Sequence, residues 1–566
     1  MSAFQDAKRQ ILLDLKSAVG KEFTPTVADL TTPPDAKLGE VAFPCFALAK
    51  ATKRNPTELA SEIAAKLETK GFVARAVAAG PFVNFTLDMK ALGDAALGEI
   101  VAQGDAYGKA PPGKTRVMVE FANPNTHKEA HVGHLRNFFV GQAVVNLLSA
   151  AGYEVIPVSY INDLGTHVAK TLWMMKKSGE LPGKEDRIAF MGRMYTEAVR
   201  AEEADPEAVK KEVSVIHRDL EELKGPYVSS WKKSRKWSLA ELHAIFKELG
   251  LTIDKTYYES ELIGETKRLV EDLRHRSIAV QSEGAVIVDL TPEKLGVNLL
   301  VKSDGTLLYN AKDLALAYRK EDDFHPDRSL YVVDGRQSLA LKQLFATLKR
   351  AGFQKELGHV SYEFITLKEG AMSSRKGNII RYESFRDEMV ALARAETAKR
   401  HQDWAAKKVE KVARAVAFAA IRFGVLKQDL DKAITFDMQE ALSFDGFTGP
   451  YLLYTCARAK SLLKKAGRAK RANAGDALTH PTERALLMKL ARFPETVHES
   501  ASAIHPSGIA QCLFDLAQAF AAFYEAVNVL ESQGAAKAQR LALVDAVRQV
   551  MENGLALLGI DTVEEM

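Results

Sequence analysis

The chain has 566 residues, a formal net charge of +4 and an apolar fraction of 47%, so about three or four domains are expected rather than one core. The small net charge excludes a global field that attracts nucleic acid, and any nucleic-acid surface must be a local patch. Three separated cysteines favour a reducing compartment, the cytoplasm, and the lack of a long uncharged apolar run predicts no membrane span.

Residues 1–108 are predicted to form a small α+β domain. Asn55 followed by Pro56 has the pattern of a helix N-cap with proline at the first helical position. Residues 81–87 are predicted to form a strand, and the glycine- and proline-rich residues 108–113 are predicted to form a linker.

Residues 109–400 are predicted to form an α/β domain. Strand candidates alternate with helices such as 135–148 and 339–351, a pattern that predicts a mostly parallel, Rossmann-type sheet with helices on both faces. Between about 170 and 300 the chain is charged and largely helical, and we interpret this stretch as an insertion between two halves of the fold. The strand candidates are residues 117–121, 155–160, 330–333 and 360–367.

Residues 401–566 are predicted to form an α-helical bundle, because apolar residues recur there with helical spacing. Between Arg458 and Arg471 seven lysine or arginine residues occur without an acid. Tyr451 and Tyr454 lie one helical turn apart just before this run. Aromatic rings beside cations suit unstacked RNA bases, although a solvated helix face is the simpler alternative. The RNA-binding candidates are Tyr451, Tyr454, Arg458, Lys464 and Lys465.

A nucleotide site is predicted where the strand at 117–121 is followed by a helix. His131 and His134 flank Gly133 at the start of that helix. A helix N-terminus presents free N–H groups and a partial positive charge, which suit phosphate. The histidines add donors, and the glycine lets a nucleotide approach the backbone. Two exposed histidines at a helix cap are an equally good interpretation of this motif in isolation.

The motif HVGH at 131–134 resembles the His-Ile-Gly-His signature of class I aminoacyl-tRNA synthetases. The loop AMSSRKGN at 371–378 resembles their Lys-Met-Ser-Lys-Ser signature, but Ala371 and Ser374 replace both lysines, while Arg375 and Lys376 keep the loop cationic. Longer segments over nearly the whole chain resemble arginyl-tRNA synthetases in particular, namely residues 119–137, 160–166, 302–320, 330–353, 442–462 and 554–566.

The resemblance implies two reaction steps. The arginine carboxylate attacks the α-phosphate of ATP, and the terminal 2′-OH of the arginine tRNA then takes the arginyl group. It also implies that Lys128 stands in for a missing signature lysine and that Mg²⁺ arrives with ATP, without a dedicated protein metal site. The implied catalytic and ATP-binding residues are Lys128, His131, Gly133, His134, Met372, Ser373, Arg375 and Lys376.

Selection of arginine requires acids that face the planar fork of guanidinium donors. The resemblance implies that Glu120 and Asp313 fill this role with Tyr309, and that Asn125 and Gln337 hold the α-amino end. Each acid could instead be an ordinary strand-end or helix-start residue, and Tyr309 could be core packing. Two weaker candidates are Asp163 and His167.

Two other functions stay open at this point. One is a class I synthetase for another amino acid, such as lysine or cysteine, although no zinc-ligand set favours cysteine. The other is a catalytically inactive, synthetase-like RNA-binding protein, which the altered signature loop allows and the intact histidine motif disfavours. The expected partners are arginine tRNA, L-arginine and ATP, and the protein is expected to be a monomer. The N-terminal domain resembles the tRNA-contacting addition of the family.

Overall fold

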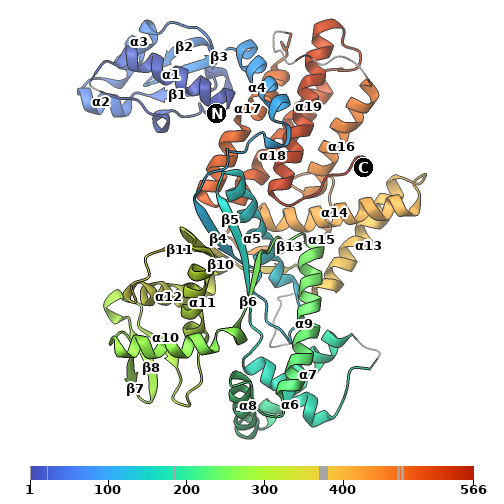
Figure 1. Ribbon diagram of the computed structural model, residues 1–566. Helices are drawn as coiled ribbons and strands as arrows, with labels where there is room; N and C mark the ends of the chain where they lie inside the picture. The colour runs from blue at the N-terminus through green and yellow to red at the C-terminus, as the bar shows by residue number, and fades with distance from the viewer. Residues whose placement is uncertain (1, 22, 184–185, 369–379, 468–471, 473–476) are drawn as a thin grey trace. The chain divides into compact units, whose positions relative to one another are not determined.

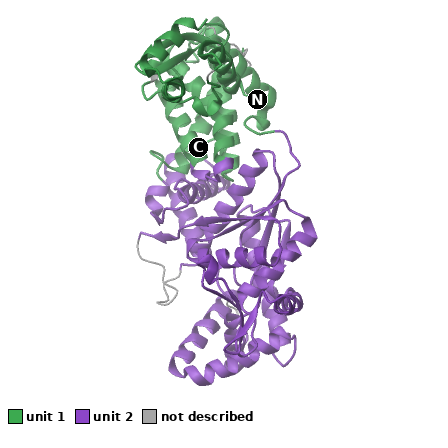
Figure 2. Ribbon diagram, turned by 90° about the vertical axis from the view of Figure 1, so that its left-hand side faces the viewer, with its two compact units in different colours: residues 1–110, 443–500, 508–566 green, residues 111–442, 501–507 purple. Residues whose placement is uncertain are grey.

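The computed structural model describes residues 2–21, 23–183, 186–368, 380–467, 472 and 477–566. The chain divides into two compact units (Figure 2). Unit 1 contains residues 1–110, 443–500 and 508–566, and unit 2 contains residues 111–442 and 501–507. Within the described ranges, no helix is both long and apolar enough to cross a membrane.

Within the described residues, unit 2 is built on a parallel sheet with the strand order β11-β10-β4-β5-β6 (Figure 1). The order reverses between β4 and β10, and ligands bind at the carboxyl ends of strands beside such a reversal. The strands are β4 (Arg116–Glu120), β5 (Glu154–Ile161), β6 (Lys255–Tyr258), β10 (Arg328–Asp334) and β11 (Glu356–Tyr362). The helices α5 (Val132–Ala150), α11 (Tyr309–Phe324) and α12 (Ser338–Arg350) connect or flank them.

The predicted strands at 117–121, 155–160 and 330–333 correspond to β4, β5 and β10. The strand predicted at 360–367 is two strands. The chain leaves the main sheet after β11, and β12 (Ile365–Leu367) pairs with β13 (Ile434–Phe436) instead. A continuous apolar run cannot reveal such a change of partner.

The insertion is helical as far as Glu248, as predicted, in helices α6 (Thr166–Ser178), α7 (Arg187–Ala204), α8 (Pro206–Glu221) and α9 (Val228–Glu248). Beyond that point the helical interpretation is incomplete. The unpredicted β6 joins the edge of the main sheet, and helix α10 (Ile263–His275) precedes an antiparallel sheet. That sheet contains β7 (Val280–Ser282), β8 (Ala285–Asp289) and β9 (Val297–Val301).

The antiparallel sheet was missed because its turn signal is weak. Glu283 and Gly284 connect β7 to β8 with φ angles of 48° and 82°. A two-residue turn with two positive φ angles is the type I′ hairpin, for which Asn-Gly is the usual signal. Glutamate at the first position hides the turn from sequence reasoning.

Helices α13 (Tyr382–Arg400) and α14 (Ala406–Leu426) contact each other, and α14 also contacts α5. With the short helix α15 (Met438–Ala441), residues 401–442 therefore group with unit 2. Our sequence analysis placed them in the C-terminal bundle. Helical periodicity shows that α14 has an apolar face, but it does not show which partner covers that face.

Unit 1 combines the N-terminal region with the C-terminal helices. Asn55 caps α3, and its Oδ1 accepts a hydrogen bond from the Thr57 N–H at 2.8 Å, which confirms the predicted helix start. The N-terminal helices are α1 (Ala3–Val19), α2 (Phe46–Thr52), α3 (Pro56–Lys66) and α4 (Met89–Gln103), and the sheet contains β1 (Val41–Pro44), β2 (Val73–Ala79) and β3 (Phe82–Leu87). The C-terminal helices are α16 (Gly449–Ala466), α17 (Pro481–Ala503), α18 (Pro506–Ala526) and α19 (Gly534–Leu557).

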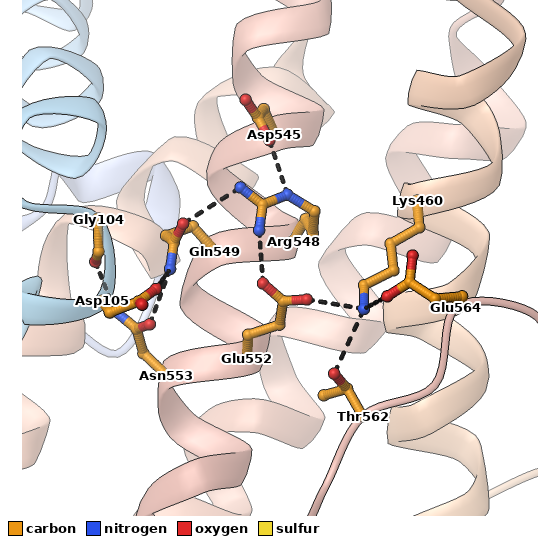
Figure 3. Close-up of polar contacts among 10 residues, drawn as sticks. All are labelled: Gly104, Asp105, Lys460, Asp545, Arg548, Gln549, Glu552, Asn553, Thr562 and Glu564. Carbon is orange, nitrogen blue, oxygen red and sulfur yellow. Dashed lines mark hydrogen bonds and ion pairs between the residues drawn. The ribbon is translucent and has the colours of Figure 1, made fainter.

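A polar network on α19 joins the two parts of unit 1 (Figure 3). Gln549 donates to the Asp105 carboxylate at 2.8 Å, and Asn553 donates to the Gly104 carbonyl at 3.0 Å. On the other side of α19, Glu552 accepts from Lys460 of α16 at 2.8 Å. The segment that ends the N-terminal region and the helix that carries the RNA-binding candidates therefore pack on one helix.

Candidate active site

His131 and His134 cap the N-terminus of α5. The His131 Nδ1 accepts a hydrogen bond from the Gly133 N–H at 3.1 Å, and the His134 Nδ1 accepts one from the His131 N–H at 3.1 Å. This arrangement is a capping box in which histidines replace the usual serine and glutamate. Because each Nδ1 is an acceptor, each neutral ring carries its proton on Nε2.

Both rings are neutral near pH 7. Burial lowers the pKa of His131 to about 4, with a further contribution from Lys128, and lowers the pKa of His134 to about 3. The ring centroids lie 3.9 Å apart. The alternative of two exposed histidines at a helix cap is therefore correct about the cap and wrong about the exposure. The rings are partly buried in the wall of a cavity.

The cavity has a volume of about 830 Å³ and lies at the carboxyl ends of β4, β5 and β10. This volume is in the range of small-molecule sites. The predicted residues on its wall come from segments up to about 200 residues apart. They are Glu120, Asn125, His131, Gly133, His134, Tyr309, Asp313 and Gln337.

Lys128 is not among the residues that line the cavity. The Lys128 side chain is exposed, and its Nζ lies 5.4 Å from the ring centroid of Tyr195 on α7. The remaining predictions fall on the signature loop and lie outside the described residues. They are Met372, Ser373, Arg375 and Lys376.

Glu120 stands at the end of β4 and is 5% exposed. One carboxylate oxygen forms an ion pair with Lys320 of α11, and the other accepts from the Asn123 amide at 2.8 Å. Burial opposes the charge on Lys320, but the Glu120 carboxylate raises the pKa of Lys320 overall. Glu120 is therefore a paired acid.

Asp313 lies in the second turn of α11 beside the Glu120–Lys320 pair. Burial and the Glu120 carboxylate together raise the pKa of Asp313 to about 8. Tyr309 begins the same helix and is 54% exposed, which contradicts the alternative of core packing. Gln337 is exposed at the turn before α12. The acid-rich part of the cavity thus has one carboxyl group that is protonated near pH 7.

The two weaker candidates have other positions. Asp163 is fully buried, forms an ion pair with Arg235 of α9 at 2.5 Å, and accepts from the Ser260 N–H at 2.8 Å. These contacts fix the end of β5 to the insertion. His167 lies in the first turn of α6, and neither residue lines the cavity.

Several cavity residues were missed by sequence reasoning. Asn123, Tyr160 and Asn162 follow or end β4 and β5, so the rule that ligands bind at carboxyl ends of parallel strands could have found them. The same rule could have found Asp334, which follows the predicted strand at 330–333. The others carried no usable signal, because their place depends on the ends of β10 and β11 meeting those of β4 and β5. They are Tyr331, Arg336, Tyr362 and Phe364. Among the described residues, no group of three or more histidine, cysteine or acidic side chains could hold a metal ion.

The RNA-binding candidates lie on α16 in unit 1. The Arg458 guanidinium stacks on the rings of Tyr454 and Tyr524 at 4.6 and 4.9 Å, and the Tyr451 ring packs edge-on against Phe514 at 5.8 Å. Both tyrosines of α16 are partly buried, so their rings contribute to packing within unit 1.

Acidic residues that are distant in the sequence pair with lysines of the cationic run. Lys464 forms an ion pair with Glu565 at 2.8 Å, and Lys460 forms one with Glu564 at 2.8 Å. Lys465 is exposed. Residues close to the end of the chain therefore offset part of the charge that the local sequence suggests.

Comparisons with known proteins match the whole chain. A sequence model described as tRNA synthetases class I (R), catalytic domain, matches residues 96–438. The DALR anticodon binding domain matches residues 452–566, and the arginyl tRNA synthetase N terminal domain matches residues 5–87.

Full-length relatives and solved structures agree with these matches. The arginine–tRNA ligase of Bdellovibrio bacteriovorus is 38% identical over 98% of both chains. That of Clostridium perfringens is 33% identical and covers 99% of this chain and 100% of its own. The solved Thermus thermophilus arginyl-tRNA synthetase is similar with a TM-score of 0.81 and 28% identity, and covers 99% of this chain and 100% of its own.

Proposed function

Because this chain belongs to the arginyl-tRNA synthetase family, we propose that its 830 Å³ cavity is where arginine and ATP react. The chain is an arginine–tRNA ligase of class I, and it charges tRNA with arginine. One observation carries the proposal: a single cavity contains both the acids suited to guanidinium and the histidine-capped helix suited to phosphate. Full-length similarity to arginine ligases leaves no support for the lysine, cysteine or inactive alternatives.

The first step forms arginyl-adenylate and releases pyrophosphate. Its nucleophile, the arginine carboxylate, is already an anion, so the step needs no general base. It needs in-line positioning and stabilisation of charge on the triphosphate. The Nε2–H groups of His131 and His134 and the N-terminus of α5 would donate to phosphate oxygens, and Gly133 lets the nucleotide come close.

Cations must complete the nucleotide end. We assign this role to Lys128 together with Arg375 and Lys376 of the signature loop, with Met372 and Ser373 beside the nucleotide. Lys128 would leave the Tyr195 ring to reach the triphosphate. Mg²⁺ bound to ATP would offset phosphate charge, held by the triphosphate and water rather than by a dedicated set of side chains.

At the other end, the guanidinium would pair with Asp313, with Glu120 and Tyr309 alongside. Because Lys320 already binds one Glu120 oxygen, Asp313 is the less committed carboxylate and the main partner. Asn125 and Gln337 would hold the α-amino end. A bidentate acid site favours a planar guanidinium over the compact ammonium of lysine.

The second step transfers arginine to the tRNA 2′-OH. We propose that the C-terminal helices of unit 1, which lie within the predicted domain of residues 401–566, bind the anticodon side through Tyr451, Tyr454, Arg458, Lys464 and Lys465, and that residues 1–108 also contact tRNA. Residues 109–400 would carry the chemistry. We further propose that the enzyme works as a monomer in the cytoplasm, where its substrates occur.

A charging assay with purified arginine tRNA and each of the twenty amino acids tests this assignment. Arginine alone should be attached. An Asp313→Asn variant should lose arginine attachment, and a Ser229→Ala variant, which changes an exposed serine of α9, should not. Comparable attachment of lysine by the unmodified enzyme would show that the acid pocket is assigned wrongly.

A further inference from the structure

Lys128 follows a residue with a strained backbone. His127 has a φ angle of 60°, in the left-handed region that residues with a side chain seldom occupy. Such a conformation persists only where the surroundings fix it, and it is found preferentially at functional sites. The contacts of His127 therefore show which residues hold its backbone in this conformation.

Two serines of the insertion hold His127. Its ring is 1% exposed, and its Nε2 lies 2.7 Å from the Ser234 Oγ. The Ser234 hydroxyl donates to the Ser230 carbonyl at 2.9 Å, so it accepts the proton of Nε2. The His127 backbone N–H donates to the Ser238 Oγ at 2.9 Å. Ser234 and Ser238 lie one turn apart on α9 and therefore face the same side.

The serine-bearing helix is itself fixed to the main sheet. The Trp231 indole donates to the Asp163 carbonyl at 2.8 Å, and Arg235 forms an ion pair with the Asp163 carboxylate. Asp163 lies two residues after the end of β5. Through α9 and β5, the position of His127 is thus fixed relative to the strand ends that form the cavity.

The chain after Lys128 is held from the other side. The Glu129 carboxylate lies 3.4 Å from the Arg381 guanidinium, and the Ala130 carbonyl accepts from the Tyr382 N–H at 2.9 Å. Residues 380–382 follow the signature loop directly. The backbone around Lys128 is therefore fixed on both flanks, while its side chain is exposed.

We propose that His127, clamped by Ser234 and Ser238, is a positioning residue that sets the reach of Lys128 toward the triphosphate. The inference rests on the role proposed above for Lys128. A fixed Cα three residues before His131 sets the point from which the Lys128 side chain extends toward the helix N-terminus, and such preorganisation lowers the cost of reaching the transition state. Burial lowers the pKa of His127 to about 3, so the clamp adds no charge beside the lysine.

The test removes the clamp with and without Lys128. We would combine Ser234→Ala with Ser238→Ala and measure ATP–pyrophosphate exchange in the presence of arginine tRNA. The expected result is a loss of kcat of about tenfold, with the KM for arginine within about twofold. When Lys128 is already replaced by alanine, the same two serine changes should lower kcat by less than about twofold relative to Lys128→Ala alone, because the effects of coupled residues are not additive. Ser229→Ala on the same helix is the matched control and should be silent.

A second comparison isolates the backbone. Asparagine adopts the left-handed region more readily than alanine. His127→Asn should therefore retain more activity than His127→Ala, and it remains usable if the double serine variant does not fold, as judged by thermal unfolding.

Two outcomes overturn the proposal. Equal losses in both backgrounds would show that the clamp acts independently of Lys128, although the role of Lys128 itself would stand. A silent Lys128→Ala would overturn both the clamp and the assigned role of the lysine.

Discussion

The two ends of the cavity, one proposed to bind arginine and the other ATP, differ in the charges that they carry. At the arginine end, Glu120 and Lys320 form a buried ion pair beside Asp313. At the nucleotide end, His131 and His134 are neutral, and Lys128, which we assign to the triphosphate, lies off the wall. Permanent buried charge suits a ligand group whose charge never changes. Neutral oriented donors, with cations brought from outside, suit charge that develops during the reaction.

The arginine end also carries more acid than base. Next to Asp313, Lys312 is buried between two carboxylates, at 3.0 Å from Glu221 and 2.5 Å from Glu259. Together with the Glu120–Lys320 pair, these groups make more carboxyl groups than lysines. The acids are Asp313, Glu120, Glu221 and Glu259, and the lysines are Lys312 and Lys320. Burial and the nearby carboxylates raise the pKa of Asp313 to about 8, so this proposed partner of the guanidinium would give up its proton when arginine binds.

The largest expected effect is at Asp313. Changing Asp313→Asn should weaken arginine use by roughly 2–5 kcal/mol, which is about 30- to 5,000-fold, because a buried guanidinium loses its charged partner. The KM for ATP should change little. Steady-state exchange assays with each substrate varied in turn measure both. A similar loss for both substrates would mean that the two ends do not act separately.

The next effect is at His134. Replacement by alanine should lower the rate of activation by about 10²–10³-fold, the usual loss for one oriented donor at developing charge. Arginine binding, measured by calorimetry, should stay close to that of the unmodified enzyme. The circular dichroism of the variant should also be unchanged, because Val132–Ala150 is held by its buried face as well as by its cap. Near-normal turnover would remove His134 from the assigned site.

Local features of both ends could be predicted from the sequence. The start of α5 is encoded within four residues, so its capping histidines were placed correctly. Glu120 and Asp313 were named from resemblance, and both line the cavity. The partner of Glu120 could not be foreseen, because Lys320 is 200 residues away and nothing local marks it as buried. The same limit concealed Glu564 and Glu565 beside the cationic run of α16.

The edge strand β6 and the serines that hold His127 could not be predicted from the sequence either. The strand Lys255–Tyr258 is short and polar, and its pairing with β5 depends on how the insertion returns to the sheet. The serines of α9 that hold His127 have no motif, since serine is common on helix surfaces. Periodicity identifies faces of elements, whereas the site depends on which faces meet.

A smaller effect is expected from pH at the arginine end. The pKa of Asp313 is about 8, and in the proposed site arginine would bind the ionised form of this carboxyl group. Binding therefore releases a proton below pH 8, and affinity should fall by about tenfold per unit as pH decreases from 7.5 to 6. Calorimetry in buffers of different ionisation enthalpy counts the released proton. Asp313→Asn should abolish the slope, and a slope that survives would assign the proton to another group.

The smallest effect is expected for ATP over the same pH range, in contrast to the pH dependence expected for arginine. The pKa of His131 is about 4 and that of His134 about 3, so neither ring gains an appreciable charge at pH 6. Histidines at their ordinary pKa near 6.5 would become mostly cationic there and would bind the triphosphate more tightly. The KM for ATP should change by less than about twofold between pH 7.5 and pH 6, measured with excess Mg²⁺ so that the charge of the nucleotide stays constant. Tighter ATP binding at pH 6 would show that the histidines act as cations, and the contrast between neutral and charged ends would fail.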